Sequence, residues 1–411
     1  MKKILILLSA ASILLTACHK NDCPEPEPIE RTVLVYVAGD NNLSGRDGSI
    51  NYFNYDIKQM MAGTQNLPTN YKLVLFVDRY NSKPYFLQVE KGDTLRLKSM
   101  DTEMKSSDPA TLHMAMKYVT ETFPAKSYGL VLWGHSDGWI TRSDSGPRKA
   151  YGVDKNQGQT WMNIPEMSQT LASLPKLKFI FADCCSFLCV ENAYELHNYA
   201  EYIIGSPAEI PGEGAPYQTV VPALFSTDDD FYKTIIDAYY AQMSLGYKVP
   251  LAVVKNSELD NLAQATATTL ATIARDIEPD ADGCRYPNVD GLIFYFDHTQ
   301  FDMQDFMLRY ASADQYAEWK KAFDKAVPYH TFAEVWMANH VTYKTEYEFD
   351  DFTPTKERMG TLGMFIPQRE SDTHWWKTEY YIFLEKSMNE MNSDIKKMQW
   401  YKAARLADIG W

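Results

Sequence analysis

Two residues that could act as a nucleophile and its base each follow an apolar stretch of the chain. His135 comes after 128–133 (YGLVLW) and a glycine, and Cys185 comes after 176–182 (KLKFIFA) and Asp183-Cys184. A thiol becomes an effective nucleophile when a neighbouring imidazole stabilises its thiolate, which requires the two groups to lie within about 3 to 4 Å in the working complex. The pair therefore predicts a catalytic Cys–His dyad, if the fold brings the two stretches side by side.

The elements that would position this pair alternate along the chain. Apolar runs typical of buried parallel strands lie at 32–38, 71–78, 128–133, 176–182 and 202–206, with helical patterns at 50–62, 109–122, 164–174 and 187–199. Such recurrent βα units predict an α/β fold with an open, mostly parallel sheet flanked by helices. Ligands of these sheets bind beyond the carboxyl ends of the strands, where both His135 and Cys185 lie.

Cys184 competes with Cys185 for the role of nucleophile because the two are adjacent. Successive residues of a strand point to opposite faces of the sheet, so only one of the two thiols can meet His135. The other cysteines are Cys18, Cys23, Cys189 and Cys284. The spacing of the six matches neither a disulfide framework nor a zinc site.

Four segments, in this order, resemble the landmarks of the clostripain family of cysteine peptidases: VLVYVAGDNNLS (33–44), LVLWGHSDGW (130–139), FADCCSFLCVENAYEL (181–196) and SPAEIPGEGAPY (206–217). The resemblance covers roughly residues 31–226. It implies the caspase-like fold of that family and a dyad of His135 and Cys185. It favours Cys185 over Cys184, because Asp183-x-Cys185 keeps the Asp-x-Cys spacing of the family.

Ser136 departs from the family pattern, which usually has glycine after the histidine. In the family the backbone N–H at this position is thought to help hold the developing oxyanion, and Ser136 retains that donor. If the residue must adopt positive φ, a serine would be strained by about 1 kcal/mol or more, which would weaken or abolish activity. An inactive clostripain-like binding lipoprotein is therefore the alternative interpretation.

The same residues also match a serine-hydrolase motif. The run Gly134-His135-Ser136-Asp137-Gly138 has the Gly-x-Ser-x-Gly spacing of the α/β-hydrolase nucleophile elbow, with Ser136 as the nucleophile. The histidines that could serve as its base are His298, His330, His340 and His374. An elbow must lead straight into a helix, whereas 139–147 (WITRSDSGP) reads as a loop, which counts against this interpretation.

Substrate specificity is implied by the resemblance. Clostripain-like peptidases cut after basic residues, commonly arginine, which calls for a carboxylate in the specificity pocket. The candidates are Asp183 and two acids of the loop after the fifth strand, Glu209 and Glu213, with Glu213 preferred. A basic-specific enzyme could also cut itself in the loop after His135, at Arg142, Arg148, Lys149 or Lys155.

The first residues resemble an export signal. Lys2-Lys3, an apolar run and Leu15-Thr16-Ala17-Cys18 have the zones of a secretory signal peptide that ends in a lipoprotein box. The apolar run is too short to span a membrane. We therefore expect a signal peptide at 1–17, lipid attached to Cys18, and an extended Pro- and Glu-rich tether at 18–30. Such a chain would be an exported bacterial lipoprotein of the cell envelope, at the outer membrane or cell surface.

Composition bounds the remaining choices. The 411 residues are 45% hydrophobic, which suits a folded peptidase core at 31–226 with an α+β C-terminal extension at 227–411. The net charge of -14 repels nucleic-acid phosphates, so we expect no nucleic-acid partner. The family resemblance implies peptide or protein substrates, and lipid on Cys18 would make the membrane a partner. Cys–His chemistry requires no cofactor. Calcium is used by some clostripain-like enzymes, but the acids near Asp350-Asp351 lack EF-hand spacing, and we expect no metal site.

Overall fold

The computed structural model describes residues 27–141, 150–155, 160–241, 249–296, 299–334, 336, 353–373 and 386–411. Cys18, the expected signal at 1–17 and most of the tether lie outside these residues, so the lipoprotein hypothesis stays a prediction. Asp350-Asp351 also lies outside them. Among the described residues, no helix joins the length and the apolar character that a membrane span requires.

A nine-stranded sheet forms the centre of the fold, in the order β13-β10-β9-β8-β5-β1-β2-β3-β4. The parallel strands at its centre are β9 (Ala200–Gly205), β8 (Leu177–Asp183), β5 (Ala125–Gly134), β1 (Ile29–Gly39) and β2 (Tyr71–Arg79). Antiparallel strands extend both edges: β3 (Ser82–Glu90) and β4 (Asp93–Ser99) beyond β2, and β10 (Ala252–Lys255) and β13 (Tyr329–His330) beyond β9. The predicted open, mostly parallel α/β sheet is confirmed.

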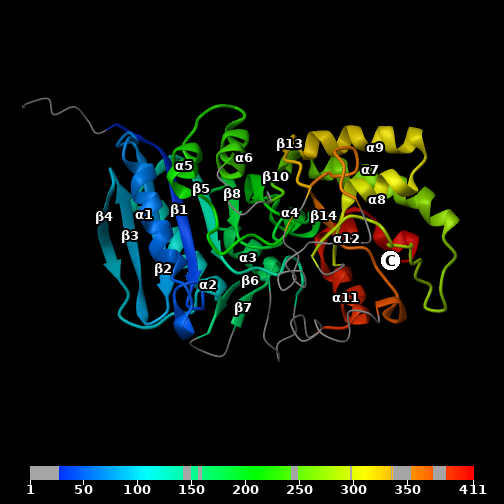
Figure 1. Cartoon of the computed structure of the whole chain (residues 1–411), viewed down its shortest axis with the longest axis horizontal. Helices are drawn as coiled ribbons and strands as arrows, with labels where there is room; N and C mark the ends of the chain where they lie inside the picture. The colour runs from blue at the N-terminus through cyan, green and yellow to red at the C-terminus, as the bar shows by residue number, and fades with distance from the viewer. Residues whose placement is uncertain are drawn as a thin grey trace, which may run out of the picture.

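Strand alternation divides the core into two layers, one on each face of the sheet. Along β1, Val35 and Val37 pack on one face, and Leu34 and Tyr36 pack on the other. The first, which we call the α1 face, is covered by α1 (Tyr52–Thr64), α5 (Tyr217–Leu224) and α6 (Phe231–Ala241). The second, the α2 face, is covered by α2 (Pro109–Thr122), α3 (Ile164–Leu171) and α4 (Val190–Leu196). Figure 1 shows α1 lying across the blue strands of the N-terminal half.

The C-terminal half of the chain packs beside the β13 edge of the sheet, opposite β4 (Figure 1). Its helices are α7 (Leu259–Ile273), α8 (Met303–Tyr310), α9 (Ala313–Ala326), α11 (Met388–Asp394) and α12 (Gln399–Ala403). A small antiparallel sheet joins β11 (Phe294–Phe296), β12 (Gln300–Asp302) and β14 (Gly363–Met364). Because β10 and β13 belong to the central sheet, the boundary expected after residue 226 does not coincide with an edge of that sheet.

A short hairpin lies in the segment that the sequence presents as a polar loop after His135. β6 (Tyr151–Asp154) pairs in antiparallel fashion with β7 (Thr160–Met162). Tyr151 is fully buried, and its hydroxyl lies 3.0 and 3.1 Å from the carbonyl oxygens of Tyr36 and Trp133. Strands this short give no periodic signal, which is why the sequence pattern misses them. The hairpin closes the carboxyl ends of β1 and β5.

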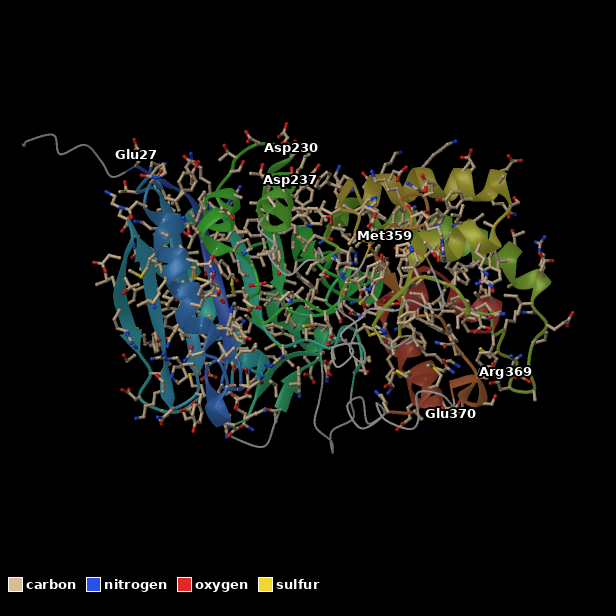
Figure 2. The ribbon with its side chains drawn as sticks, viewed as in Figure 1. Glu27, Asp230, Asp237, Met359, Arg369 and Glu370 are labelled. Atoms are coloured by element: carbon tan, nitrogen blue, oxygen red, sulfur yellow. The ribbon has the colours of Figure 1, made fainter. Side chains whose placement is uncertain are left out.

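Acidic side chains stand on the outer surface, in keeping with the net charge of -14. Figure 2 shows Asp230, just before α6, and Asp237, within it, pointing away from the core, and both are exposed. Asp237 accepts a hydrogen bond from the Tyr329 hydroxyl and so also ties α6 to β13. The exclusion of nucleic acid stays a prediction that rests on the overall charge.

Candidate active site

The carboxyl ends of β5 and β8 lie side by side at the centre of the sheet. In their parallel register Trp133 pairs with Asp183, so His135 and Cys185 each lie two residues beyond a matched pair. Neighbouring parallel strands are about 4.8 Å apart, and both side chains therefore start from adjacent segments of backbone. The structure thus brings the two residues singled out by the sequence to one edge of the sheet.

The two adjacent cysteines differ in how deeply they are buried. Cys184 is 0% exposed and packs on the α2 face, whereas Cys185 is partly exposed and packs on the α1 face. The two thiols point to opposite faces, as strand alternation predicts. A substrate carbonyl can reach only a thiol that is open to solvent. The geometry therefore favours Cys185 as the nucleophile, in agreement with the Asp-x-Cys spacing.

The imidazole of His135 is held by Asn42, which the sequence did not single out. Its Nε2 lies 2.9 Å from Asn42 Oδ1. Because a carbonyl oxygen only accepts, Nε2 carries the proton and Nδ1 keeps its lone pair. Burial, and then the positive charge of Lys155, lowers the pKa of His135 to about 4, so the ring is neutral at pH 7. In the sequence, Asn42 belongs to a turn-forming segment after β1 that gives no sign of its partner.

The thiol of Cys185 faces the loop after β9. Its Sγ accepts a hydrogen bond from the Ile210 N–H at 3.5 Å and donates to the Ile210 carbonyl oxygen at 3.8 Å. Burial, followed by the negative charge of Glu209, raises the pKa of Cys185 well above its ordinary value. His135 and Cys185 are thus both neutral, and within the described structure they share no hydrogen bond. This is the arrangement of a resting site in which the thiol keeps its proton.

Ser136 adopts no strained backbone conformation. Positive φ occurs at a few described residues other than glycine, and Ser136 is not one of them. The strain that serine would suffer in place of glycine is therefore absent, which removes the reason for expecting an inactive protein. In the described structure the Ser136 backbone N–H donates to no protein acceptor, and it stays available to an oxyanion. Left-handed backbone instead follows the thiol, at Ser186 with φ 54°.

Two acids lie buried beneath the ends of β5 and β8, on the α1 face. Asp183 accepts hydrogen bonds from the Ala215 N–H at 2.9 Å and the Tyr217 hydroxyl at 2.7 Å. Asp56, from α1, accepts from Trp133 Nε1 at 2.8 Å, and its other oxygen, Oδ1, is buried without a partner. Burial, and then the charge of Asp183, raises the pKa of Asp56 to about 8. Sequence reasoning missed Asp56, because a helical pattern does not mark a buried acid.

The two glutamates considered for substrate binding take different places. Glu209 is partly buried, and its charge acts on the Cys185 thiol. Glu213 is exposed, and its charge acts on Asp56. Asp183 holds the loop that carries Glu213, because it binds the backbone at Ala215. The charges of Glu209 and Asp183 thus act on Cys185, and which acid receives a substrate side chain stays a prediction.

The structure does not form the nucleophile elbow that Ser136 would need. Ser136 is 2% exposed, its hydroxyl accepts from the Gly138 N–H at 3.3 Å, and residues 135–141 contain no helix. Of the candidate bases, His298, His340 and His374 lie outside the described residues. His330 lies on β13, which is separated from β5 by β10, β9 and β8. The serine-hydrolase interpretation therefore lacks its helix, and the one candidate base among the described residues, His330, lies on a distant strand.

Comparison with known proteins supports a cysteine peptidase. The model of the clostripain family matches residues 35–402. No curated protein matches the chain. The family match extends through the C-terminal half, well beyond the stretch of 31–226 that carries the sequence motifs.

Several solved structures are similar over nearly the whole chain. A secreted C11 cysteine protease from Bacteroides thetaiotaomicron, in complex with an irreversible peptide inhibitor, has a TM-score of 0.70 and 26% identity, covering 92% of this chain and 99% of that one. An inactive zymogen C11 protease from Parabacteroides distasonis has a TM-score of 0.69 and 26% identity, with the same coverage. A further secreted C11 cysteine protease from Bacteroides thetaiotaomicron, at 20% identity and a TM-score of 0.69 over 92% and 100% of the two chains, supports the fold alone.

Proposed function

Because the chain belongs to the clostripain family of cysteine peptidases, we propose that it is an endopeptidase that cleaves after Arg or Lys with Cys185 as nucleophile and His135 as proton carrier. The observation that carries the proposal is the pairing of Trp133 with Asp183, which starts both side chains from neighbouring strand ends. The partial exposure of Cys185 supports the choice of thiol.

Acylation begins from the neutral pair. As the scissile carbonyl approaches, Sγ of Cys185 bonds to the carbonyl carbon, the thiol proton passes to Nδ1 of His135, and the carbonyl electron pair moves onto oxygen. The Ser136 backbone N–H donates to that oxyanion, a contribution worth about 2.7 to 4 kcal/mol for a single well-placed donor. The imidazolium then protonates the leaving amine, the C–N bond breaks, and an acyl-enzyme remains.

Deacylation uses the same two residues in the reverse sense. His135 takes a proton from water, the hydroxide attacks the thioester carbon, and the C–S bond breaks as that proton passes to Cys185. The carboxylic acid product leaves and releases its own proton to solvent. Asn42 keeps Nε2–H directed throughout, so that Nδ1 is the nitrogen that exchanges protons. No cofactor takes part in this scheme.

Preference for basic residues would come from the acids on the α1 face. Both carboxylate oxygens of Asp183 already accept hydrogen bonds, so Asp183 would shape the pocket. The unpartnered Oδ1 of Asp56 is the deeper acceptor for an ammonium or guanidinium group, with Glu209 and Glu213 nearer the entrance. A bound cation would lower the raised pKa of Asp56, which stabilises the complex.

Export and anchoring rest on the sequence. The charged, apolar and small-residue zones before Cys18 support removal of 1–17 and attachment of lipid to Cys18. The similar protein from Bacteroides thetaiotaomicron is described as secreted, which fits a site of action outside the cytoplasm. Metabolic labelling with a fatty acid tests this step: the wild type is expected to take up label, and Cys18→Ser is expected to lose it together with membrane association.

The experiment for the reaction is labelling with a lysine- or arginine-directed acyloxymethylketone, followed by intact-mass analysis and peptide mapping. We expect one adduct on Cys185 of the wild type. Cys185→Ala is expected to lose both the adduct and turnover, with at least about a 1,000-fold fall in kcat. Cys184→Ala is the matched control, since it removes the neighbouring buried thiol.

The controls separate the remaining interpretations. His135→Ala is expected to slow labelling of Cys185 while the protein keeps its melting temperature within a few degrees. Labelling that moves to Cys184, or that continues unchanged in Cys185→Ala, would contradict the proposal. A folded wild type that neither labels nor turns over any Arg or Lys peptide would favour an inactive binding lipoprotein.

A further inference from the structure

One side chain of the C-terminal half contacts both segments that carry the dyad. Gln300, the first residue of β12, is 0% exposed, and its Nε2 donates to the Ser186 carbonyl oxygen at 2.8 Å. Ser186 directly follows Cys185. A Cβ added to Gly138, three residues beyond His135, would lie 2.0 Å from the same Nε2. The amide therefore fills the space that this glycine leaves open.

Ser186 has a backbone conformation that needs such support. Its φ of 54° lies in the left-handed region, which residues other than glycine rarely adopt. A residue keeps such a conformation only where its surroundings fix it. The Ser186 N–H donates to the Ala208 carbonyl oxygen at 2.9 Å, and Gln300 binds the Ser186 carbonyl. Gln300 thus fixes one end of the residue that sets how the chain leaves Cys185.

Packing alone does not explain a glutamine at this position. The Oε1 of Gln300 is buried and accepts no hydrogen bond within the described residues. A buried polar oxygen without a partner costs stability, and an apolar side chain of the same length would avoid that cost. What the glutamine supplies, and an apolar side chain does not, is the hydrogen bond to Ser186.

Two further hydrogen bonds join the C-terminal half to these segments at points farther from the dyad. Trp139 Nε1 donates to the Thr299 carbonyl oxygen at 3.3 Å. The Gly363 N–H donates to the Leu188 carbonyl oxygen at 3.1 Å. These bonds hold the segments in place as a whole, whereas Gln300 binds the residue next to the nucleophile.

We infer that Gln300 is a positioning residue of the peptidase site. It makes no hydrogen bond to Cys185 or His135 within the described structure, and it acts by holding Ser186 in its left-handed conformation. The thiol and the imidazole share no hydrogen bond at rest, so the geometry in which they meet depends on the backbone that carries them. The inference rests on the proposed function, because it takes Cys185 and His135 as the reacting pair.

The test replaces Gln300 by methionine, which keeps the length of the side chain and removes the donor. Misplacement of a reacting group by about 1 Å costs on the order of 100-fold in rate, so kcat of Gln300→Met for an arginine peptide is expected to fall about 10- to 100-fold. KM is expected to change less than about threefold, because binding of the substrate is retained. The melting temperature is expected to stay within about 3 °C or to rise, since the unpartnered oxygen is removed. A purely structural role would lower the melting temperature and leave kcat of the folded protein unchanged.

Gln304→Met is the matched control. Gln304, on α8, is also buried, its Nε2 donates to the Glu357 carbonyl oxygen at 2.7 Å, and its Oε1 has no partner within the described residues. The carbonyl that it binds belongs to the C-terminal half and not to a segment of the dyad. The same chemical change is thus made without touching Ser186, and kcat is expected to stay within about twofold of the wild type.

A glycine at position 186 tests whether Gln300 acts through Ser186. Glycine adopts positive φ without steric cost, so Ser186→Gly needs less support from outside. In the Gln300→Met background, Ser186→Gly is expected to raise kcat at least about fivefold, with Ser186→Gly alone as the reference. Equal kcat in Gln300→Met and the wild type would overturn the inference, as would a loss in Gln300→Met that glycine does not restore.

Hydrogen exchange separates this inference from the proposed function. Exchange in the peptide that contains Ser186, measured by mass spectrometry, is expected to be faster in Gln300→Met than in the wild type or in Gln304→Met. Equal exchange in the three proteins would overturn the inference whatever their activity. If the wild type neither labels at Cys185 nor cleaves a peptide, faster exchange in Gln300→Met would still show that Gln300 holds Ser186, and the proposed function would be rejected.

Discussion

Asn42 Oδ1 accepts a hydrogen bond from His135 Nε2 at 2.9 Å, and the two residues follow neighbouring strands, β1 and β5. Cys185 follows β8, on the other side of β5. The strand order β8-β5-β1 thus sets Cys185, His135 and Asn42 in one row along the edge of the sheet. Each comes from a separate βα unit, and the parallel register aligns them.

Asn42→Ala is expected to lower kcat about 10- to 100-fold, because the imidazole loses the acceptor that fixes its tautomer. Asn42→Asp places a negative charge beside Nε2–H and is expected to raise the pKa of His135 from about 4. The rate requires the neutral ring, so the acid limb of kcat/KM against pH would move to higher pH. A fall in stability without movement of that limb would show that Asn42 is only structural.

Ser136→Gly is expected to leave kcat within about threefold of the wild type. Ser136 does not adopt a positive φ, so glycine relieves no strain, and both residues supply the backbone N–H. Ser136→Ala should behave similarly in turnover. Each variant loses the hydroxyl that accepts from the Gly138 N–H, so a stability loss of about 1 kcal/mol is expected in thermal unfolding. Abolished turnover in well-folded Ser136→Ala would revive the serine-nucleophile interpretation.

Asp56→Asn keeps an oxygen for Trp133 Nε1 but removes the charge. We expect kcat/KM for arginine substrates to fall about tenfold more than for norleucine substrates, because an ion pair with the substrate is lost while the pocket keeps its shape. Glu213→Gln is the comparison at the exposed rim. Equal losses for arginine and norleucine substrates would assign Asp56 to folding and not to specificity.

Self-cleavage is expected in the segment that contains Arg142, Arg148 and Lys149, which lies outside the described residues. Wild-type protein incubated alone should give two fragments on a denaturing gel, with N-terminal sequencing placing the new end after a basic residue. Cys185→Ala should stay intact. Fragments in both preparations would point to a contaminating peptidase, and an intact wild type that still turns over substrate would remove the hypothesis.

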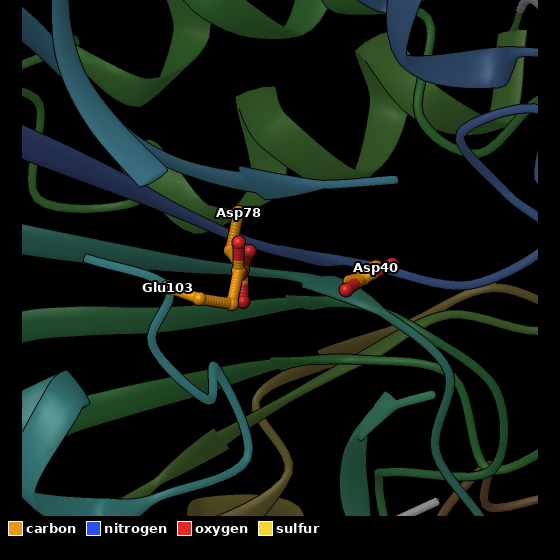
Figure 3. A group of neighbouring side chains, drawn as sticks. All are labelled: Asp40, Asp78 and Glu103. Atoms are coloured by element: carbon orange, nitrogen blue, oxygen red, sulfur yellow. The ribbon is translucent and has the colours of Figure 1, made fainter. Parts of the chain in front are cut away.

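Stability is expected to fall as pH rises, because Asp78 is buried and its carboxylate lies close to those of Asp40 and Glu103 at the carboxyl ends of β1 and β2 (Figure 3). Asp78 faces Asp40, Asp154 and Glu103, and its folded pKa of about 8 lies above the ordinary 3.8. A carboxyl whose pKa is raised by folding favours the native state most below its unfolded pKa, and this contribution is lost as pH approaches the folded pKa.

The free energy of unfolding should therefore fall between about pH 4 and pH 8, by up to about 1.4 kcal/mol per pH unit for each such group. The melting temperature should fall with it. Asp78→Asn should flatten the profile. Asp56, with a pKa also raised to about 8, contributes in the same direction and would leave a residual slope. A melting temperature that stays constant or rises over this range would contradict the expectation.

The sequence by itself determined the class of fold and the two residues at its strand ends. Continuous apolar runs at β1, β2, β5 and β8 mark buried parallel strands, since such strands are covered on both faces. The two-residue period of a strand also separates Cys184 from Cys185, because it depends only on local backbone geometry. The family motifs then imply the dyad of His135 and Cys185.

The tertiary structure alone decided which distant side chains meet. Three contacts join parts of the chain that are far apart in sequence: Asn42 with His135, Asp56 with Trp133, and Asp40 with Asp78. Their partners depend on strand order and register, which a local pattern does not encode. Burial has the same origin: Asp56 reads as an ordinary polar residue of a helix, and only the packing of α1 against the sheet encloses it and raises its pKa.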